Sequence, residues 1–153
     1  MPDTLNRRTL LTLALPAFLV ACGRSVPTTN ASYAGETPAM DRLVDKYARL
    51  YDMPASLIHR VIRRESGYNP RARNGPYYGL MQILPATAHT MGYNGPPSGL
   101  LDAETNLRYA GKYLRGAWLL SHRSESQAVH WYAVGYYYEA KKRGMLEETG
   151  LRA

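Results

Sequence analysis

The chain has 153 residues, of which 45% are hydrophobic and 20% are charged. This size and composition are those of one globular domain, and they exclude a disordered, collagen-like or multidomain chain. The net charge of +7 favours anionic partners. Nucleic acid, anionic lipid and acidic polysaccharide all satisfy that condition, so charge alone does not choose among them.

Residues 1–21 have the three-part pattern of an export signal. Arg7 and Arg8 give a positive start, and a largely apolar run of twelve residues follows from Leu10 to Ala21. A membrane-spanning helix needs about 20 residues, so this run is too short to span a bilayer. We therefore exclude the segment from the fold and expect the protein to be exported.

The sequence Leu-Val-Ala-Cys at residues 19–22 resembles a bacterial lipobox. The resemblance implies that Cys22, the only cysteine, is lipidated and becomes the mature N-terminus. An ordinary signal peptide cut elsewhere, leaving Cys22 as a free thiol, is the alternative. Residues 22–38 lack periodicity and are predicted to be a flexible tether. We expect a periplasmic protein anchored by lipid to the outer membrane, with no nucleic-acid partner.

Residues 39–153 are predicted to form one mainly α domain, a compact helical bundle with a substrate groove. Apolar residues recur at helical spacing over about 40–51, and Pro54 with Ser56 begins a second helix that runs to Glu65. A short helix is expected over 85–91. Asp102 is a candidate N-cap for a long helix, and Ser124 begins a last helix that is expected to continue to about Lys142. No alternating pattern predicts a strand.

Glu65 interrupts the apolar face of the second predicted helix. At about 100° per residue, four apolar side chains lie within about 80° of it; these are Leu57, Ile58, Val61 and Ile62. Three arginines are expected on the opposite side: Arg60, Arg63 and Arg64. Burial and the negative helix end would raise the carboxyl pKa of Glu65, as suits a general acid in glycoside cleavage. The alternative is a helix that ends a turn earlier, with Glu65 solvated or paired with Arg71 or Arg73.

Two motifs surround this acid. The sequence Glu-Ser-Gly-Tyr-Asn-Pro at 65–70, followed by Gly-Leu-Met-Gln-Ile-Leu-Pro-Ala-Thr-Ala at 79–88, resembles the signature of lysozyme-like lytic transglycosylases. The resemblance extends over about residues 40–142. It implies the α+β lysozyme-like superfamily, peptidoglycan strands as the substrate, and Glu65 as the single catalytic acid/base.

The resemblance also implies substrate-binding residues. Ser66, Met81 and Gln82 belong to the two motifs, and the Gln82 amide can both donate to and accept from an N-acetyl group. Asn74 lies nine residues after Glu65, where many family members carry a serine. Core packing for Met81 and an ordinary turn for Asn74 are the alternatives.

A third family motif, Ala-Tyr-Asn-Ala-Gly, is replaced here by Trp-Tyr-Ala-Val-Gly at 131–135. Tyr132 matches the tyrosine whose hydroxyl lies near the acid. Ala133 departs from the asparagine, so one polar group of that wall is absent.

The family resemblance implies cleavage of the glycan at N-acetylmuramic acid with formation of a 1,6-anhydro end. The remaining candidate acids, Asp102, Glu104 and Glu125, fit helix starts better than a second catalytic group. The histidines show no ligand spacing, so neither a metal nor a cofactor is expected. A muramidase of the same fold and a non-catalytic wall-binding lipoprotein remain alternatives.

Overall fold

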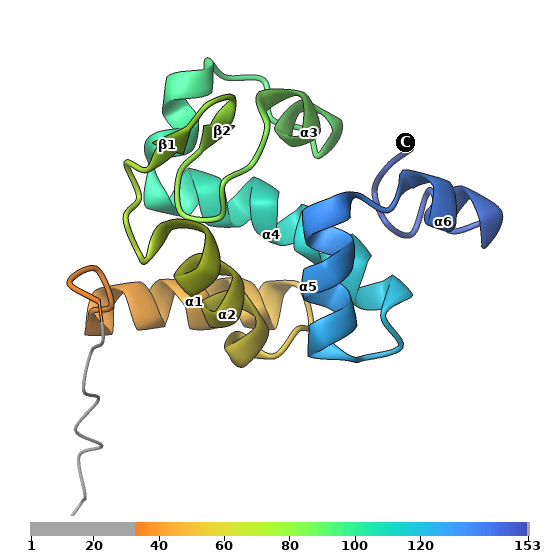
Figure 1. Ribbon diagram of the computed structural model, residues 1–153, viewed down its shortest axis with the longest axis horizontal. Helices are drawn as coiled ribbons and strands as arrows, with labels where there is room; N and C mark the ends of the chain where they lie inside the picture. Colours follow the sequence, from red (N-terminus) through yellow and green to blue (C-terminus); the bar gives the residue numbers. More distant parts are fainter. Residues whose placement is uncertain (1–32, 153) are drawn as a thin grey trace, which may run out of the picture. The chain divides into compact units, whose positions relative to one another are not determined.

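The computed structural model describes residues 33–152, and the expected export signal, Cys22 and most of the tether lie outside this range. The described part is mainly α-helical, as the sequence predicts (Figure 1). Its elements, in chain order, are α1 (Pro38–Leu50), α2 (Ala55–Ser66), β1 (Arg73–Asn74), β2 (Tyr77–Tyr78), α3 (Pro85–Thr90), the 3-10 helix η1 (Pro97–Leu101), α4 (Ala103–Leu120), α5 (Glu125–Val134) and α6 (Tyr137–Lys142).

Three of the helices begin at a side-chain cap. Thr37 accepts from the backbone N–H of Met40 at the start of α1. Asp102 accepts from Thr105 at 2.8 Å and Ser124 from Gln127, so both predicted caps are confirmed. A side-chain oxygen at this position satisfies a backbone N–H that has no partner within the helix, which fixes where the helix starts.

Helix α4 lies at the centre of the described domain and packs against α1, α3, α5 and η1 (Figure 1). One apolar face of this helix is buried: Leu107, Ala110, Leu114, Ala117 and Trp118. The buried face of α2 contributes the four predicted apolar residues to the same core. Burial of this shared surface is the main force that holds α2 in place.

Strands β1 and β2 form a short antiparallel hairpin, although the sequence predicted no strand there. Asn74 pairs with Tyr77 across Gly75 and Pro76, and two residues per strand are too few to produce a visible alternating pattern.

The segment after the hairpin is fastened by one amide, that of Asn106 on α4. This fully buried side chain accepts from the Met81 N–H and donates to the carbonyls of Tyr78 and Leu100, at 2.8 to 2.9 Å. Gly79 makes this close approach possible, since a Cβ there would lie 2.2 Å from the Asn106 amide nitrogen. A residue of α4 thus sets the position of the chain next to Glu65.

Two predicted boundaries differ from the structure. The last helix was expected to continue to about Lys142, but Gly135 separates α5 from α6 with φ 82° and ψ 149°, far from helical values. The tether was expected to reach residue 38, but Glu36 accepts from Tyr68 and lies 3.7 Å from Arg63. Residues 33–37 therefore contact α2 and the motif that follows it. Across residues 33–152, no helix has the length and apolar character needed to cross a bilayer.

Candidate active site

Glu65 lies in the last turn of α2, so the alternative of an earlier helix end is excluded. Leu57, Ile58 and Val61 hold the helix against the core. Gly67 then adopts φ 56° and ends the helix, because a residue in the left-handed region cannot continue it. Rigid packing on one side and a sharp stop on the other fix the direction of the Glu65 side chain.

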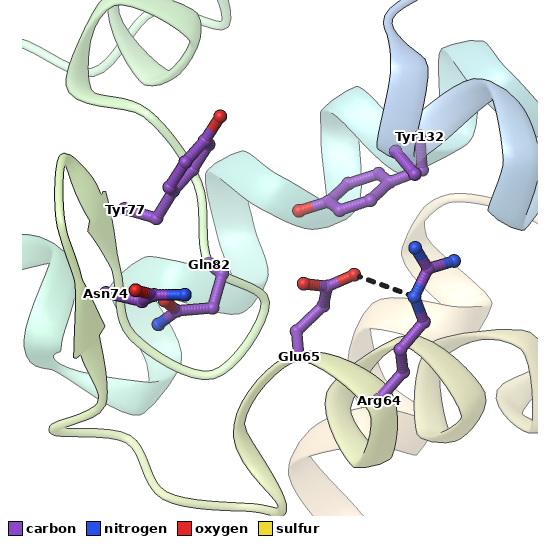
Figure 2. A pocket seen from close by; sticks show the side chains of 7 residues that line it. Arg64, Glu65, Asn74, Tyr77, Gln82 and Tyr132 are labelled. Carbon is purple, nitrogen blue, oxygen red and sulfur yellow. Dashed lines mark ion pairs between the residues drawn. The ribbon is translucent and has the colours of Figure 1, made fainter.

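The Glu65 carboxyl group points into a pocket of about 250 Å³ (Figure 2). Figure 2 shows Gln82, Asn74 and Tyr77 on one side of this carboxyl group and Tyr132 and Arg64 on the other. The lining comes from α2, the hairpin, the segment after it and α5: Arg64, Glu65, Asn74, Tyr77, Gln82, Tyr132 and Ala133. Among these lining residues, Glu65 is the only carboxylic acid.

The environment favours the protonated form of Glu65. Its side chain is 24% exposed, and burial raises the carboxyl pKa above its ordinary value. The guanidinium of Arg64 opposes this effect, with Nε 3.4 Å from Glu65 Oε1. The net direction is upward, as the sequence predicts, and it is the direction that proton donation by a carboxylic acid requires.

The position of Arg64 corrects the sequence prediction. A helical projection separates neighbouring residues by about 100°, which placed Arg64 on the side opposite Glu65. Arginine has a long side chain, however, and its guanidinium curves back to the carboxyl group. Arg60 and Arg63 do follow the prediction and contact Ser126 and Glu36 instead.

Gln82 lies in the pocket wall with its donors already used. The residue is 9% exposed and has φ 50°, an unusual backbone conformation for a residue other than glycine. Its Nε2 donates to the carbonyls of Ala72 and Gly79, whereas Oε1 has no hydrogen-bond partner in the part of the chain described here. The sequence predicted an amide that both donates and accepts; in this arrangement only the oxygen remains for a further hydrogen bond.

Tyr132 joins α5 to the segment that carries Gln82. Its hydroxyl donates to the Met81 carbonyl at 2.8 Å, and Figure 2 shows the ring beside Glu65. Burial, and then the nearby Glu65 charge, hold the pKa of the Tyr132 hydroxyl well above its ordinary value. The hydroxyl therefore stays protonated and neutral next to the acid.

Met81 and Ser66 do not line the pocket. The side chain of Met81 is fully buried in the core, so its predicted contact with substrate is wrong for the side chain; core packing, the alternative, is what the structure has. Met81 lies in a turn that directs its side chain into the core, and its carbonyl accepts from the Tyr132 hydroxyl. The hydroxyl of Ser66 donates to the Ile62 carbonyl within α2.

Strand β1 brings Asn74 to the pocket. Two other lining residues were not predicted from the sequence, one on β2 and one on α2. Tyr77 on β2 is 42% exposed and faces the pocket. The pairing of Asn74 with Tyr77 is what places both side chains here, and a two-residue strand gives no sequence signal for it. Arg64 is the other missed residue; its position next to the acid in the chain was the available signal.

The remaining candidate acids lie elsewhere. Asp102 caps α4, Glu104 pairs with Lys46, and Glu125 accepts from the hydroxyl of Ser56. Within residues 33–152, no group of three or more potential metal ligands comes together.

The fold and the site define a class. The described residues form a mainly helical, lysozyme-like domain with a lone carboxylic acid at the end of one helix, facing a polar pocket. The family model described as "Transglycosylase SLT domain" matches residues 42–145, and the chain belongs to that family.

Curated relatives carry the same resemblance over part of the chain. Residues of this protein are 36% identical over 85 positions to the soluble lytic murein transglycosylases of Escherichia coli K12 and of Salmonella typhimurium. The match covers 50% of this chain and only 13% of each relative. The chain therefore corresponds to a small part of those proteins.

Proposed function

We propose that this protein is a peptidoglycan lytic transglycosylase that cleaves the β-1,4 bond between N-acetylmuramic acid and N-acetylglucosamine. Glu65 serves as the single acid/base, and the products end in 1,6-anhydro-N-acetylmuramic acid. Family membership and the likeness to murein transglycosylases support the substrate class. The positive charge of the chain suits a polymer with carboxylate groups.

One observation supports this chemistry above the others: the pocket lining contains a single carboxyl group whose pKa is raised by burial. Most glycoside hydrolases use two carboxylic acids, about 5 to 10 Å apart. With one acid, Glu65 first protonates the glycosidic oxygen, and the 2-acetamido oxygen of the substrate supports the charge that develops at C1. The Glu65 carboxylate then takes the proton of the 6-hydroxyl, whose oxygen bonds to C1.

The arrangement of the pocket assigns roles to the other residues. The Arg64 guanidinium, 3.4 Å from Glu65, favours the carboxylate that exists after the first proton transfer. Gln82 accepts from a substrate N–H, such as that of an acetamido group, only if its buried and unpartnered oxygen becomes exposed to the pocket. Asn74 and Tyr77 provide a polar and an aromatic surface on the same wall. Ser66 can bind substrate only if the hydrogen bond from its hydroxyl to the Ile62 carbonyl breaks.

Replacement of Glu65 by Gln tests the assignment. The amide keeps the size of the side chain and cannot donate a proton as an acid, so glycan cleavage should fall by at least 100-fold. Release of soluble fragments from purified sacculi measures the rate. Glu148→Gln is the matched control, because Glu148 is exposed and lies outside the pocket, and it should retain full activity.

Mass spectrometry of the digest identifies the reaction. Anhydro ends formed by the unmodified protein, and lost in Glu65→Gln, are the expected result. Reducing ends instead would identify a muramidase, in which water attacks C1. Intact glycan with retained binding would identify a wall-binding lipoprotein without activity. Substantial cleavage by Glu65→Gln would show that another group is the acid.

We also propose that the chain is exported to the periplasm, that Cys22 is lipidated, and that the lipid anchors the domain to the outer membrane. The export pattern of residues 1–21 and the lipobox-like residues 19–22 support this location. The tether then begins at Cys22 and ends before residue 33, since residues 33–37 contact α2. The domain itself would include those contacts and run to residue 153.

A further inference from the structure

We propose that Arg64 is a specificity-determining residue that binds a carboxylate of the glycan substrate, so that the pocket prefers muramic-acid strands to neutral chitin-like strands. The inference rests on the proposed function for its substrate class. It adds a residue that the catalytic scheme uses only as a neighbour of Glu65.

Arg64 lines the pocket with a side chain that is 52% exposed, and its hydrogen-bonding capacity is unused by the described residues. A guanidinium has five N–H donors, and none of those of Arg64 makes a hydrogen bond to any residue that the structure describes. Its closest acidic contact, Nε to Glu65 Oε1 at 3.4 Å, is longer than a charge-assisted hydrogen bond of about 2.8 Å. Figure 2 shows its two terminal nitrogens beyond that contact, on the side of Tyr132.

The neighbouring arginines on α2 are engaged elsewhere. Arg63 pairs with Glu36, and Arg60 donates to Ser126. Arg64 is also the only cationic residue in the pocket lining. Position, and not the general basic character of α2, therefore distinguishes it.

The charge balance of the pocket favours an anion at this point. Besides Glu65, the titratable groups of the lining are Arg64, Tyr77 and Tyr132, and Tyr132 is held neutral by its raised pKa. While Glu65 is protonated, the pocket carries the net positive charge of Arg64. Ala133, on the same wall, has no polar side-chain group that could compete for a substrate group.

Peptidoglycan supplies a carboxylate near the cleaved bond. The lactyl group of muramic acid is a free carboxylate when the stem peptide has been removed, and the stem peptide brings its own carboxylates when it is present. Chitin oligosaccharides share the acetamido sugars and lack both. A guanidinium fork recognises a carboxylate through two parallel hydrogen bonds, which a neutral hydroxyl cannot reproduce.

Binding of such a group also assists the acid. A carboxylate paired with Arg64 cancels the attraction of Arg64 for ionised Glu65, and this attraction is what lowers the Glu65 pKa against the effect of burial. The substrate would thus strengthen the hold of Glu65 on its proton as it enters the pocket.

The test is calorimetric titration of the full-length chain in a Glu65→Gln background, in which no substrate is consumed. Three ligands of matched length are compared: peptide-stripped glycan strands, peptide-bearing strands, and a chitin oligosaccharide. Adding Arg64→Gln should weaken binding of a carboxylate-bearing strand about tenfold, equivalent to about 1.4 kcal/mol, and leave chitin binding unchanged. Arg64→Lys should give an intermediate loss, since the charge remains and the fork is absent.

The ligands separate the two sources of the carboxylate. A loss confined to stripped strands assigns the lactyl group, and a loss confined to peptide-bearing strands assigns the stem peptide. Arg49→Gln is the charge control: it removes one exposed positive charge outside the pocket and should not change selectivity. An equal loss on chitin, or no loss on either carboxylate-bearing strand, overturns the proposal. Because no cleavage is needed, this result is independent of the anhydro ends that test the proposed function.

Discussion

Glu65 combines a local position that any helical projection predicts with an environment that only packing creates. Its carboxyl group ends the apolar face of α2, and the pocket leaves 24% of the side chain exposed. The raised pKa means that ionisation of Glu65 is harder in the folded protein than in the unfolded chain. A carboxyl group whose pKa is raised by folding therefore lowers the stability of the folded protein once the pH exceeds its unfolded pKa.

Glu65→Gln should consequently stabilise the fold above the pKa of the native carboxyl group. Below the unfolded pKa, near 4.3, both residues are neutral and the two proteins should have equal free energies of unfolding. As the pH rises through the folded pKa, the unmodified protein loses stability and the variant does not. Urea unfolding at several pH values measures the difference; a variant less stable than the parent at neutral pH would contradict it.

Residues beside Glu65 were predicted with mixed success, for reasons of side-chain direction. Gln82 and Tyr132 do line the pocket, whereas the Met81 side chain turns inward. A sequence motif shows which residues are neighbours in the chain. It does not show which backbone carbonyl a side chain will hydrogen-bond to. The use of both Gln82 donors by Ala72 and Gly79 was invisible for the same reason.

At the scale of elements, the hairpin and the segment after it depend on α4. Asn106 is fully buried, and all of its hydrogen-bonding groups hold the backbone of the segment from residue 78 to residue 100. A buried amide with every partner satisfied is favourable, but the same backbone groups without partners are costly. This amide makes the pocket wall part of the core.

Asn106→Leu should destabilise the protein strongly. The substitution keeps the branched shape and leaves the Met81 N–H and the Leu100 carbonyl without this partner, at about 1 to 3 kcal/mol each, whereas the Tyr78 carbonyl keeps the Ile83 N–H. We expect a loss of at least about 2 kcal/mol in the free energy of unfolding, measured in urea. Asn94→Leu, in an exposed loop, is the control and should change it by less than about 0.5 kcal/mol. A small effect at Asn106 would mean that the hairpin holds itself.

Helix starts were the most predictable feature at this scale, because caps act within three residues. Asp102 and Ser124 begin α4 and α5 as expected. The end of α5 was not predictable in the same way: Gly135 is tolerated within a helix at modest cost, but here it has a positive φ of 82° and the next residue, Tyr136, is buried in the core.

At the scale of the whole molecule, the chain combines an N-terminal export pattern with a folded domain. The net charge of +7 of the whole chain would favour an anionic polymer, and an anchor at Cys22 would restrict the protein to the wall close to the membrane. One acyl group binds a membrane only marginally, so stable anchoring needs more than one chain or an added attraction.

Cys22→Ser should therefore release the protein from the membrane fraction. A metabolically incorporated fatty-acid analogue should label the unmodified protein and not the variant. Fractions are washed at high salt, because electrostatic attachment to the wall is screened there and lipid attachment is not. A labelled variant, or an unmodified protein that the salt wash releases entirely, would contradict a lipid anchor and favour the ordinary signal peptide.

The sequence alone determined the helical class, two helix caps and the position of Glu65 at the end of the apolar face of its helix, because apolar periodicity and capping are interactions between residues close in the chain. Tertiary structure decided what surrounds the acid: Arg64 beside it, Met81 turned away from it, and a hairpin that brings Tyr77 across from Tyr132. Those positions depend on contacts such as the one between Tyr132 and Met81, across 51 residues. Packing between elements that are distant in the chain determines these positions. A local sequence pattern therefore does not predict them.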